Sequence, residues 1–566
     1  MIRISFRNSE MPVRPADKIV TATDYSKLLS GEKTVGYTNI KYVLNDLWHN
    51  NEPYGQVGKS TFNLPEAGMN DNPGHPMLPR EGLFIAIPSN ATITSVGVNE
   101  NTKTIMNGKF DILPVPKPNL EGERLMFEQS SDIYDSDSDY PAISIEYAGD
   151  INVFGITCAH FLFSPLRYTP ANGKIAAITQ ATIRVNYELN KNPEETAAVE
   201  TLTQPHFAEQ LLGYDIMSET SNLPRLLILT NQDLSGAMDK YREAKSAKYT
   251  VETVFYEDIV TSPDDDAPEL IYNFLKKYHT EKPIRHLVIG GEVNIIPTKL
   301  LVDEAKPLDP KVASDSYYCI DTANDNYIPR FSISRFPASN VAELSGLCAL
   351  ALEYPTVSKD KRETAIFTTF SDNKTKVYDE CKDDICTAVE ASGRGINIQK
   401  YYDKSCSKKD LINAINYGVG FINYRGHGAW DRWQSSIGLN TMDVGNLRLG
   451  SDTPHVLSVT CCNSAIHLYP ELCFGAAWIR QLKAISFLGT SAATYTTENN
   501  FFDKFLWEAI CPPNIKTAGL SVIGDIYFQA IVNFVRQFPA NSRAQANIKK
   551  YLLLGDGTAD YLEQSA

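Results

Sequence analysis

The sequence has 566 residues, of which 43% are hydrophobic and 10% aromatic, so it is long enough for about three compact domains with large cores. Its net charge of −15 and pI of about 5.2 argue against a basic surface, so nucleic acid is not expected as a partner. No apolar run reaches the length of about 18 residues that a transmembrane helix needs. Residues 1–9 include two Arg and no apolar stretch, so we expect no signal peptide in this chain.

The first 200 residues alternate short apolar runs with Pro, Gly, Asn and Asp. Residues 83–88 and 181–187 are two such runs. Short strands bounded by turn residues favour an all-β unit. The acidic residues 130–139 predict a solvated loop, and the polar residues 190–204 predict a linker.

From Pro224 onward, apolar runs of strand length alternate with stretches of helical periodicity. The predicted strands are residues 226–229, 287–291, 365–368, 419–424, 455–460 and 484–488, and the predicted helices are residues 234–248, 267–278, 377–391 and 408–415. This alternation is typical of a doubly wound α/β sheet. We therefore predict an all-β domain at residues 1–204, followed by α/β subdomains at residues 205–358 and 359–566 that share one sheet region.

Two of these strands run directly into reactive side chains. The first leads to His427, between two glycines, and the second leads to Cys461. Ligands of open α/β sheets bind at the carboxyl ends of the strands, where an imidazole can take the proton of a thiol and leave a nucleophilic thiolate. The backbone N–H groups of Gly428 and Cys461 are the predicted oxyanion hole. The alternative, a buried structural Cys beside an ordinary glycine turn, stays open at this level.

The remaining cysteines do not form a recognisable metal motif. Cys381 and Cys386 are too far apart for a CxxC pair, and no His/Cys cluster follows them. We therefore predict no zinc site, no dense disulfide framework and no required cofactor.

Several short motifs carry a resemblance to a known family. They are N-Y-R-G-H-G at residues 423–428 followed by Trp433, S-V-T-C-C-N at 458–463, A-S-D-S-Y-Y at 313–318, I-S-R-F-P at 333–337, and G-H-P-M-L-P at 74–79 followed by I-A-I-P at 85–88. With these motifs the chain resembles the gingipain family of caspase-like cysteine peptidases, including the family's N-terminal prodomain. Ser464 and Gly557 depart from the family pattern.

The resemblance implies roles for individual residues. It selects Cys461 rather than Cys462 as the nucleophile, with His427 as its partner and Asp372 as the carboxylate that orients the imidazole. It places Asp379 and Tyr495 in the S1 pocket, which implies cleavage after Arg. From the residues alone, Asp372 is equally a solvated loop residue, and Asp379 equally one favoured by the N-terminus of a helix.

The resemblance also implies a cysteine endopeptidase in zymogen form, whose partners are protein or peptide substrates and its own prodomain. It implies a secreted or cell-surface protein. The expectation of a structural calcium ion rests on the resemblance alone. Two alternatives remain, a transpeptidase (a sorting enzyme) of the same fold and a non-catalytic binding protein that kept the scaffold.

Overall fold

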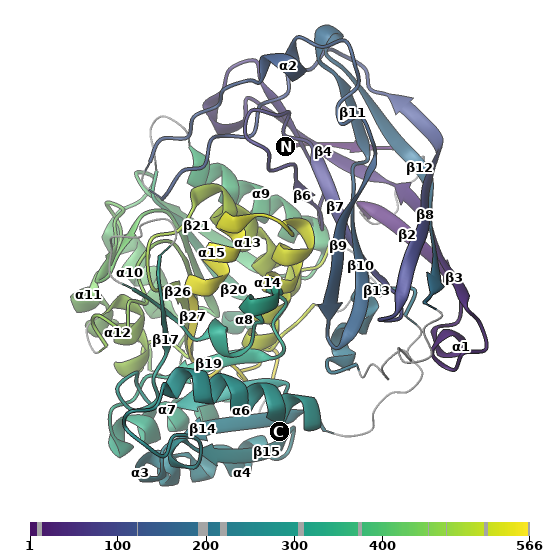
Figure 1. The fold of residues 1–566 in the computed structure, drawn as a ribbon. Coiled ribbons are helices and arrows are strands. Elements are labelled where there is room, and N and C mark those ends of the chain that lie inside the picture. Colours follow the sequence, from purple (N-terminus) through teal and green to yellow (C-terminus); the bar gives the residue numbers. More distant parts are fainter. Residues whose placement is uncertain are drawn as a thin grey trace.

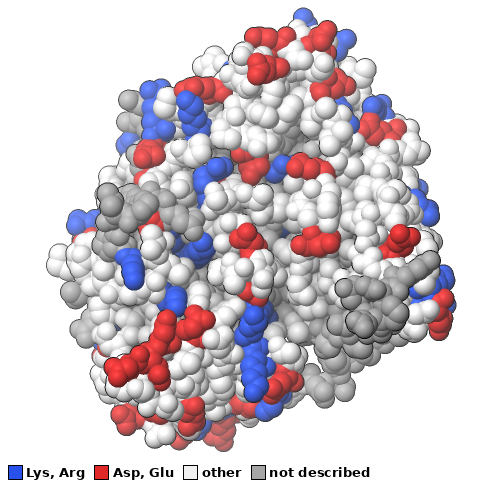
Figure 2. All heavy atoms as spheres, viewed as in Figure 1, with Lys and Arg blue, Asp and Glu red and all other residues white. Residues whose placement is uncertain are grey.

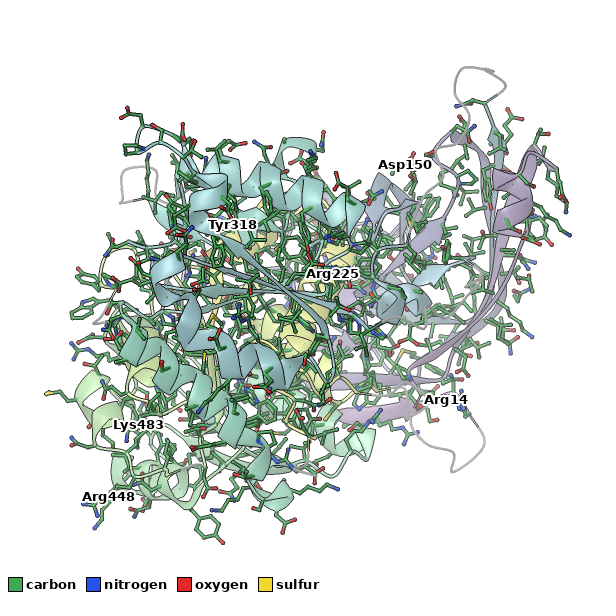
Figure 3. The ribbon with its side chains drawn as sticks, turned by 90° about the horizontal axis from the view of Figure 1, so that it is seen from below. Arg14, Asp150, Arg225, Tyr318, Arg448 and Lys483 are labelled. Atoms are coloured by element: carbon green, nitrogen blue, oxygen red, sulfur yellow. The ribbon has the colours of Figure 1, made fainter. Side chains whose placement is uncertain are left out.

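The structure is a computed structural model that describes residues 1–7, 14–121, 123–190, 202–214, 223–303, 311–371, 376–450, 452–470, 473–513 and 519–563. An all-β part comes first and a mixed α/β part follows, which confirms the predicted fold class (Figure 1). In the view from below, the strands near Arg14 and Asp150 lie to one side of the α/β part (Figure 3).

Strands of very different lengths, most of them paired antiparallel, make up the N-terminal part. Its elements are β1 (Ile2–Ser5), β2 (Ala16–Ala22), α1 (Tyr25–Leu29), β3 (Val35–Leu44), β4 (Asp46–Asn51), β5 (Ser60–Asn63), β6 (Gly68–Met69), β7 (Pro79–Ala86), β8 (Ala91–Ile105), α2 (Ser131–Tyr134), β9 (Ile145–Val153), β10 (Ile156–Phe163), β11 (Leu166–Thr169), β12 (Lys174–Leu189) and β13 (Leu211–Leu212). Along the described chain they form one sheet of three strands and two of five.

Side-chain alternation explains why these segments are strands. In β3 every second side chain is buried, and β12 follows the same rule over much of its length. One face of each strand therefore enters a core and the other faces solvent. The acidic residues 130–139, predicted to be a loop, include the one-turn helix α2, which has no buried residue. Strand β13 pairs with β7, so residues 211–212 belong to the N-terminal sheets although they follow the predicted division at residue 204.

A single sheet of ten strands organises the described α/β part. In spatial order its strands are β15 (Thr250–Phe255), β14 (Arg225–Thr230), β16 (His286–Gly290), β19 (Ser332–Phe336), β27 (Tyr551–Gly555), β26 (Ser486–Thr490), β25 (His455–Val459), β22 (Phe421–Arg425), β20 (Thr364–Thr369) and β21 (Asn397–Tyr402). All neighbours are parallel except β26 and β27. The two halves of the sheet therefore run in opposite directions and are joined through the C-terminal strand.

Helices cover this sheet, and two small antiparallel strand pairs lie outside it (Figure 1). The helices are α3 (Gln232–Ser235), α4 (Asp239–Lys245), α5 (Tyr256–Ile259), α6 (Ala267–Glu281), α7 (Val341–Glu353), α8 (Lys359–Arg362), α9 (Val377–Ser392), α10 (Lys408–Tyr417), α11 (Thr441–Gly445), α12 (Phe474–Arg480), α13 (Thr496–Ile510), α14 (Ile523–Gln537) and α15 (Ser542–Lys550), and the hairpin strands are β17 (Lys299–Leu301), β18 (Val312–Ser314), β23 (Gly428–Ala429) and β24 (Arg432–Trp433). The single helix predicted at residues 234–248 is wrong in detail, because a 3-10 turn beginning at Gly236 separates α3 from α4. Glycine is a poor residue inside a helix.

The two parts of the chain are closely packed against each other. The N–H of Gly82 in β7 donates to Gln537 Oε1 at 2.7 Å, and His160 Nε2 lies 2.7 Å from the carbonyl oxygen of Arg536. A side-chain carbon at Gly82 would lie 1.9 Å from that same carbonyl oxygen. The N-terminal sheets are therefore docked on α14 without room for a larger residue.

A buried ion pair connects two helices on the sheet. Lys382 of α9 contacts Asp503 of α13, and both side chains are fully buried. We expect Asp503→Ala to lower the free energy of unfolding by about 3–5 kcal/mol, because it leaves the Lys382 charge buried without its partner. Urea unfolding checks this. The matched control is Asp383→Ala, which removes the exposed pair with Lys400 and costs less than about 1 kcal/mol; equal losses in both variants would contradict the expectation.

Candidate active site

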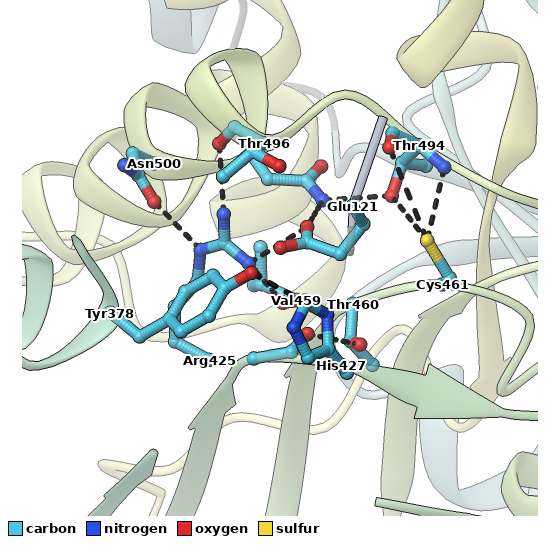
Figure 4. Close-up of polar contacts among 12 residues, drawn as sticks. Glu121, Tyr378, Arg425, His427, Val459, Thr460, Cys461, Thr494, Thr496 and Asn500 are labelled. Atoms are coloured by element: carbon cyan, nitrogen blue, oxygen red, sulfur yellow. Dashed lines mark hydrogen bonds and ion pairs between the residues drawn. The ribbon is translucent and has the colours of Figure 1, made fainter. Parts of the chain in front are cut away.

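His427 and Cys461 lie at the carboxyl ends of two neighbouring strands. Strands β22 and β25 are parallel, and Arg425 pairs with Val459, so each reactive residue lies two positions beyond a paired residue. The two loops touch, since a side-chain carbon at Gly428 would lie 2.5 Å from the carbonyl oxygen of Cys461. The sheet thus brings the predicted pair to one place, shown in Figure 4.

Aromatic side chains surround the imidazole of His427. The ring of Phe370 is 4.5 Å away between centroids and that of Tyr378 is 5.4 Å away. The hydroxyl of Tyr378 lies 3.5 Å from His427 Nδ1. Tyr424 donates its hydroxyl to the carbonyl oxygen of His427 at 2.8 Å, which fixes the backbone there. The histidine is therefore positioned from both its ring and its main chain.

The Cys461 sulfur faces the loop that precedes α13. The N–H of Thr494 donates to Cys461 Sγ at 3.2 Å, and the hydroxyl of Thr494 is 3.5 Å from the sulfur. Burial raises the pKa of the Cys461 thiol to about 12, and the negative charge of Glu121 adds to the effect. At neutral pH the thiol is therefore protonated in this arrangement, and a protonated thiol is a poor nucleophile.

The neighbouring Cys462 has a different environment. Its backbone is in the left-handed region, with φ of 62°, and its N–H donates to the carbonyl oxygen of Ala492 at 3.1 Å. A non-glycine residue in this region marks a sharp turn. The turn separates the two side chains, and the contact with Thr494 is made by Cys461.

A segment of the N-terminal part enters the site. The N–H of Glu121 donates to the carbonyl oxygen of Thr494 at 2.8 Å, and the N–H of Thr496 donates to the carbonyl oxygen of Asn119 at 3.2 Å. Leu120 lies opposite Tyr495 in an antiparallel bridge. An extended peptide bound to the edge of a binding site makes contacts of this kind. The N-terminal part thus pairs with the loop that contacts the Cys461 sulfur.

The other predicted site residues differ in their placement. Asp372 lies outside the described residues. Asp379, half-buried in the first turn of α9, accepts hydrogen bonds from the hydroxyls of Thr369 at 2.5 Å and Ser371 at 3.0 Å. Burial raises the pKa of this carboxyl. Tyr495 is held through its main chain, whose N–H donates to Asn547 Oδ1 at 3.1 Å.

Sequence reasoning gave no role to four residues that lie in the site: Glu121, Tyr378, Arg425 and Thr494. The sequence could have indicated a role for Arg425. A charged residue at the end of an apolar strand, two positions before a reactive His, is expected to be buried and therefore to need a partner of opposite charge. No feature of the sequence pointed to Glu121. It lies about 300 positions before Arg425 in the sequence, and only the folded chain brings the two residues together.

Comparison with known families agrees with this geometry. The model of peptidase family C25 matches residues 219–561, and that of the C25 propeptide matches residues 30–216. The chain belongs to peptidase family C25. The first match contains the whole ten-stranded sheet, and the second contains most of the N-terminal strands.

Individual relatives in family C25 are distant. Gingipain R1 of Porphyromonas gingivalis is 24% identical over 354 residues, which cover 60% of this chain and 34% of that protein. Lys-gingipain of the same organism is 22% identical over 482 residues, covering 78% of this chain and 26% of its own length. The chain thus spans about a third or less of these two relatives.

Solved structures support the fold. The crystal structure of the Arg-specific cysteine proteinase gingipain R has a TM-score of 0.52 at 19% identity and covers 61% of this chain and 80% of its own. The complex of the pro- and mature domains of Porphyromonas gingivalis RgpB has a TM-score of 0.51 at 20% identity, covering 59% and 79%. At these identities the match shows the fold alone.

The described residues contain no group of three or more His, Cys, Asp or Glu side chains placed to hold a metal ion. No helix in the described ranges is both long and apolar enough to span a membrane. Acidic and basic side chains are interspersed over the face drawn in Figure 2.

Proposed function

We propose that this protein is a latent cysteine endopeptidase in which Cys461 and His427 perform the chemistry and the N-terminal part is its inhibitory prodomain. One observation carries the proposal. The segment 119–121 lies extended along the loop that also contacts the Cys461 sulfur, where a substrate backbone would bind. Membership of peptidase family C25 supports the same reading.

The proposed reaction proceeds through a thioester. The thiol of Cys461 loses its proton to His427 and the thiolate attacks the scissile carbonyl carbon. The N–H groups of Gly428 and Cys461 are the proposed donors to the oxyanion. The tetrahedral intermediate collapses as the imidazolium protonates the leaving amine, which forms the thioester. Water, deprotonated by His427, hydrolyses the thioester and restores the thiol.

Latency follows from the pairing of the N-terminal part with the loop that contacts Cys461. Burial raises the pKa of Cys461 to about 12, and the charge of Glu121 in the N-terminal part adds to the effect. We therefore expect removal of the N-terminal part to lower this pKa and to increase the thiolate fraction at neutral pH. We expect proteolytic cutting between residues 190 and 225 to increase gelatin hydrolysis at least tenfold. Labelling of Cys461 by iodoacetamide at pH 7 is expected to accelerate with it. Equal rates before and after a verified cut would contradict latency.

The cut chain also tests the two alternative functions, a transpeptidase and a non-catalytic binding protein. A transpeptidase of this fold differs in the nucleophile that resolves the thioester, so incubation with a peptide ester and an amine, followed by mass analysis, reveals amide as its product. A non-catalytic binding protein would show no hydrolysis in the cut chain and no rapid labelling of Cys461.

Two further properties to be tested are the residue preferred at P1 and the cellular location of the protein. Cleavage after Arg, which the family position of Asp379 implies, is one candidate preference and cleavage after an acidic residue is the other; one panel of peptides decides between them. Family resemblance also supports a secreted or cell-surface protein. Immunoblotting of culture medium and of washed cells tests that location.

A further inference from the structure

The side chain of Glu121 is buried against a cation of the α/β part, the guanidinium of Arg425. Glu121 Oε2 is 2.9 Å from Arg425 Nη1, and Asn499 Nδ2 donates to the same oxygen at 2.9 Å. The side chain of Glu121 is 1% exposed and that of Arg425 is fully buried. Figure 4 shows the carboxylate between the guanidinium and the Cys461 loop. At a site this deeply buried, Arg425 favours a negatively charged partner over a neutral one, because without it the guanidinium would be a buried and unpaired charge.

The α/β part of the chain holds Arg425 in place. Its guanidinium donates to Asn500 Oδ1 and to the carbonyl oxygen of Thr496, both at 2.8 Å, and to that of Val459 at 3.2 Å. The ring of Tyr378 packs 4.8 Å from the guanidinium carbon. None of these contacts involves the N-terminal part, so we expect them to remain when it leaves. Among the ion pairs of the described residues, Glu121 supplies the only carboxylate bound to Arg425.

The position of Glu121 along the loop that contacts Cys461 defines the substrate residue that it imitates. We use P1 for the residue whose carbonyl carbon the thiolate attacks. Glu121 bonds through its own N–H to Thr494, the residue whose N–H contacts the Cys461 sulfur. Asn119 bonds to Thr496, two residues farther from the sulfur. The register therefore places Glu121 at P1, with its side chain in the S1 pocket.

We propose that this peptidase cleaves after acidic residues, with Glu preferred at P1, and that Arg425 is the residue that selects them. The inference rests on the proposed endopeptidase function. Removing Glu121 leaves a buried guanidinium without an anion, and a substrate carboxylate of the same length restores the pair. Glutamine has the same shape without the charge, and aspartate is one methylene shorter.

The geometry disfavours the alternative P1 residue, Arg. A substrate guanidinium in this pocket would approach the guanidinium of Arg425, and two buried like charges repel each other. The carboxylate predicted to bind it, Asp379, is already bonded to the hydroxyls of Thr369 and Ser371. The pocket therefore presents a cation where an Arg-specific site requires an anion.

The test is a panel of fluorogenic peptides that differ at P1 alone, assayed on the chain cut between residues 190 and 225. We expect kcat/KM for Glu to exceed that for the isosteric Gln at least tenfold, and to exceed that for Arg, Lys and Leu by more. Equal rates for Glu and Gln, or a preference for Arg, would overturn the inference.

Gelatin hydrolysis by the same cut chain distinguishes failure of the acidic P1 preference from failure of the endopeptidase function. Gelatin cleavage together with a preference for Arg retains the endopeptidase and rejects the acidic pocket. A cut chain that hydrolyses neither gelatin nor any peptide contradicts the endopeptidase itself, and the pocket inference falls with it.

A second measurement uses the uncut chain. Glu121→Gln keeps the shape of the side chain and removes its charge, so we expect iodoacetamide to label Cys461 at least fivefold faster, because the N-terminal segment binds less tightly. The matched control is Glu128→Gln in the exposed pair with Lys117, which is expected to leave the rate unchanged. An unchanged rate in Glu121→Gln would show that the carboxylate does not hold the segment in the pocket.

Discussion

Replacing Cys461 with alanine in the cut chain is expected to reduce peptide hydrolysis by at least about a thousandfold, because no other group supplies the attacking thiolate. The substitution removes one sulfur atom and adds no bulk, so the fold should be retained. Initial rates with the best peptide of the panel measure the loss, and circular dichroism checks the fold.

Cys462→Ala is the matched control for the nucleophile, since it removes the same atom one position along the chain. We expect it to keep most of the activity, because its backbone turns at φ of 62° and the contact with Thr494 belongs to Cys461. Loss of activity in Cys462→Ala with retention in Cys461→Ala would reverse the assignment.

His427→Ala is expected to have an effect of similar size on turnover, since both the deprotonation of the thiol and the protonation of the leaving amine require the imidazole. A drop of at least about a thousandfold in kcat is the expected result. Adding free imidazole to the cut variant provides a control, because partial recovery would show that the missing function is proton transfer.

The pH dependence of labelling gives an independent readout for His427. An imidazole beside Cys461 favours the thiolate and lowers the thiol pKa, so its removal raises the pH at which iodoacetamide reacts. The cut wild-type chain should therefore be labelled at lower pH than the cut His427→Ala chain. If labelling depended on pH in the same way in the two chains, His427 would not act on the Cys461 thiol, even if the substitution also reduced turnover.

The sequence by itself determined the fold class and predicted that His427 and Cys461 act as a pair. Alternation with a period of two at residues 181–187, which lie in β12, indicated a strand with one buried face, and the apolar runs ending near His427 and Cys461 indicated buried strands of an α/β sheet. Both signals are local, because burial of one or both faces of a strand leaves its pattern in consecutive residues. The rule that ligands bind at the carboxyl ends of strands predicted that the two residues can face one crevice, but only the structure shows that β22 and β25 are neighbours.

Only the tertiary structure decided what lines the pocket. The helix at residues 377–391 was predictable, yet which of its side chains faces the imidazole depends on how α9 docks, and the structure turns Tyr378 toward His427 and Asp379 toward Thr369. The pairing of Glu121 with Arg425 joins two separate parts of the chain. No local pattern encodes such a contact, because the two charges meet only where the two parts dock, and their attraction must offset the cost of desolvating both.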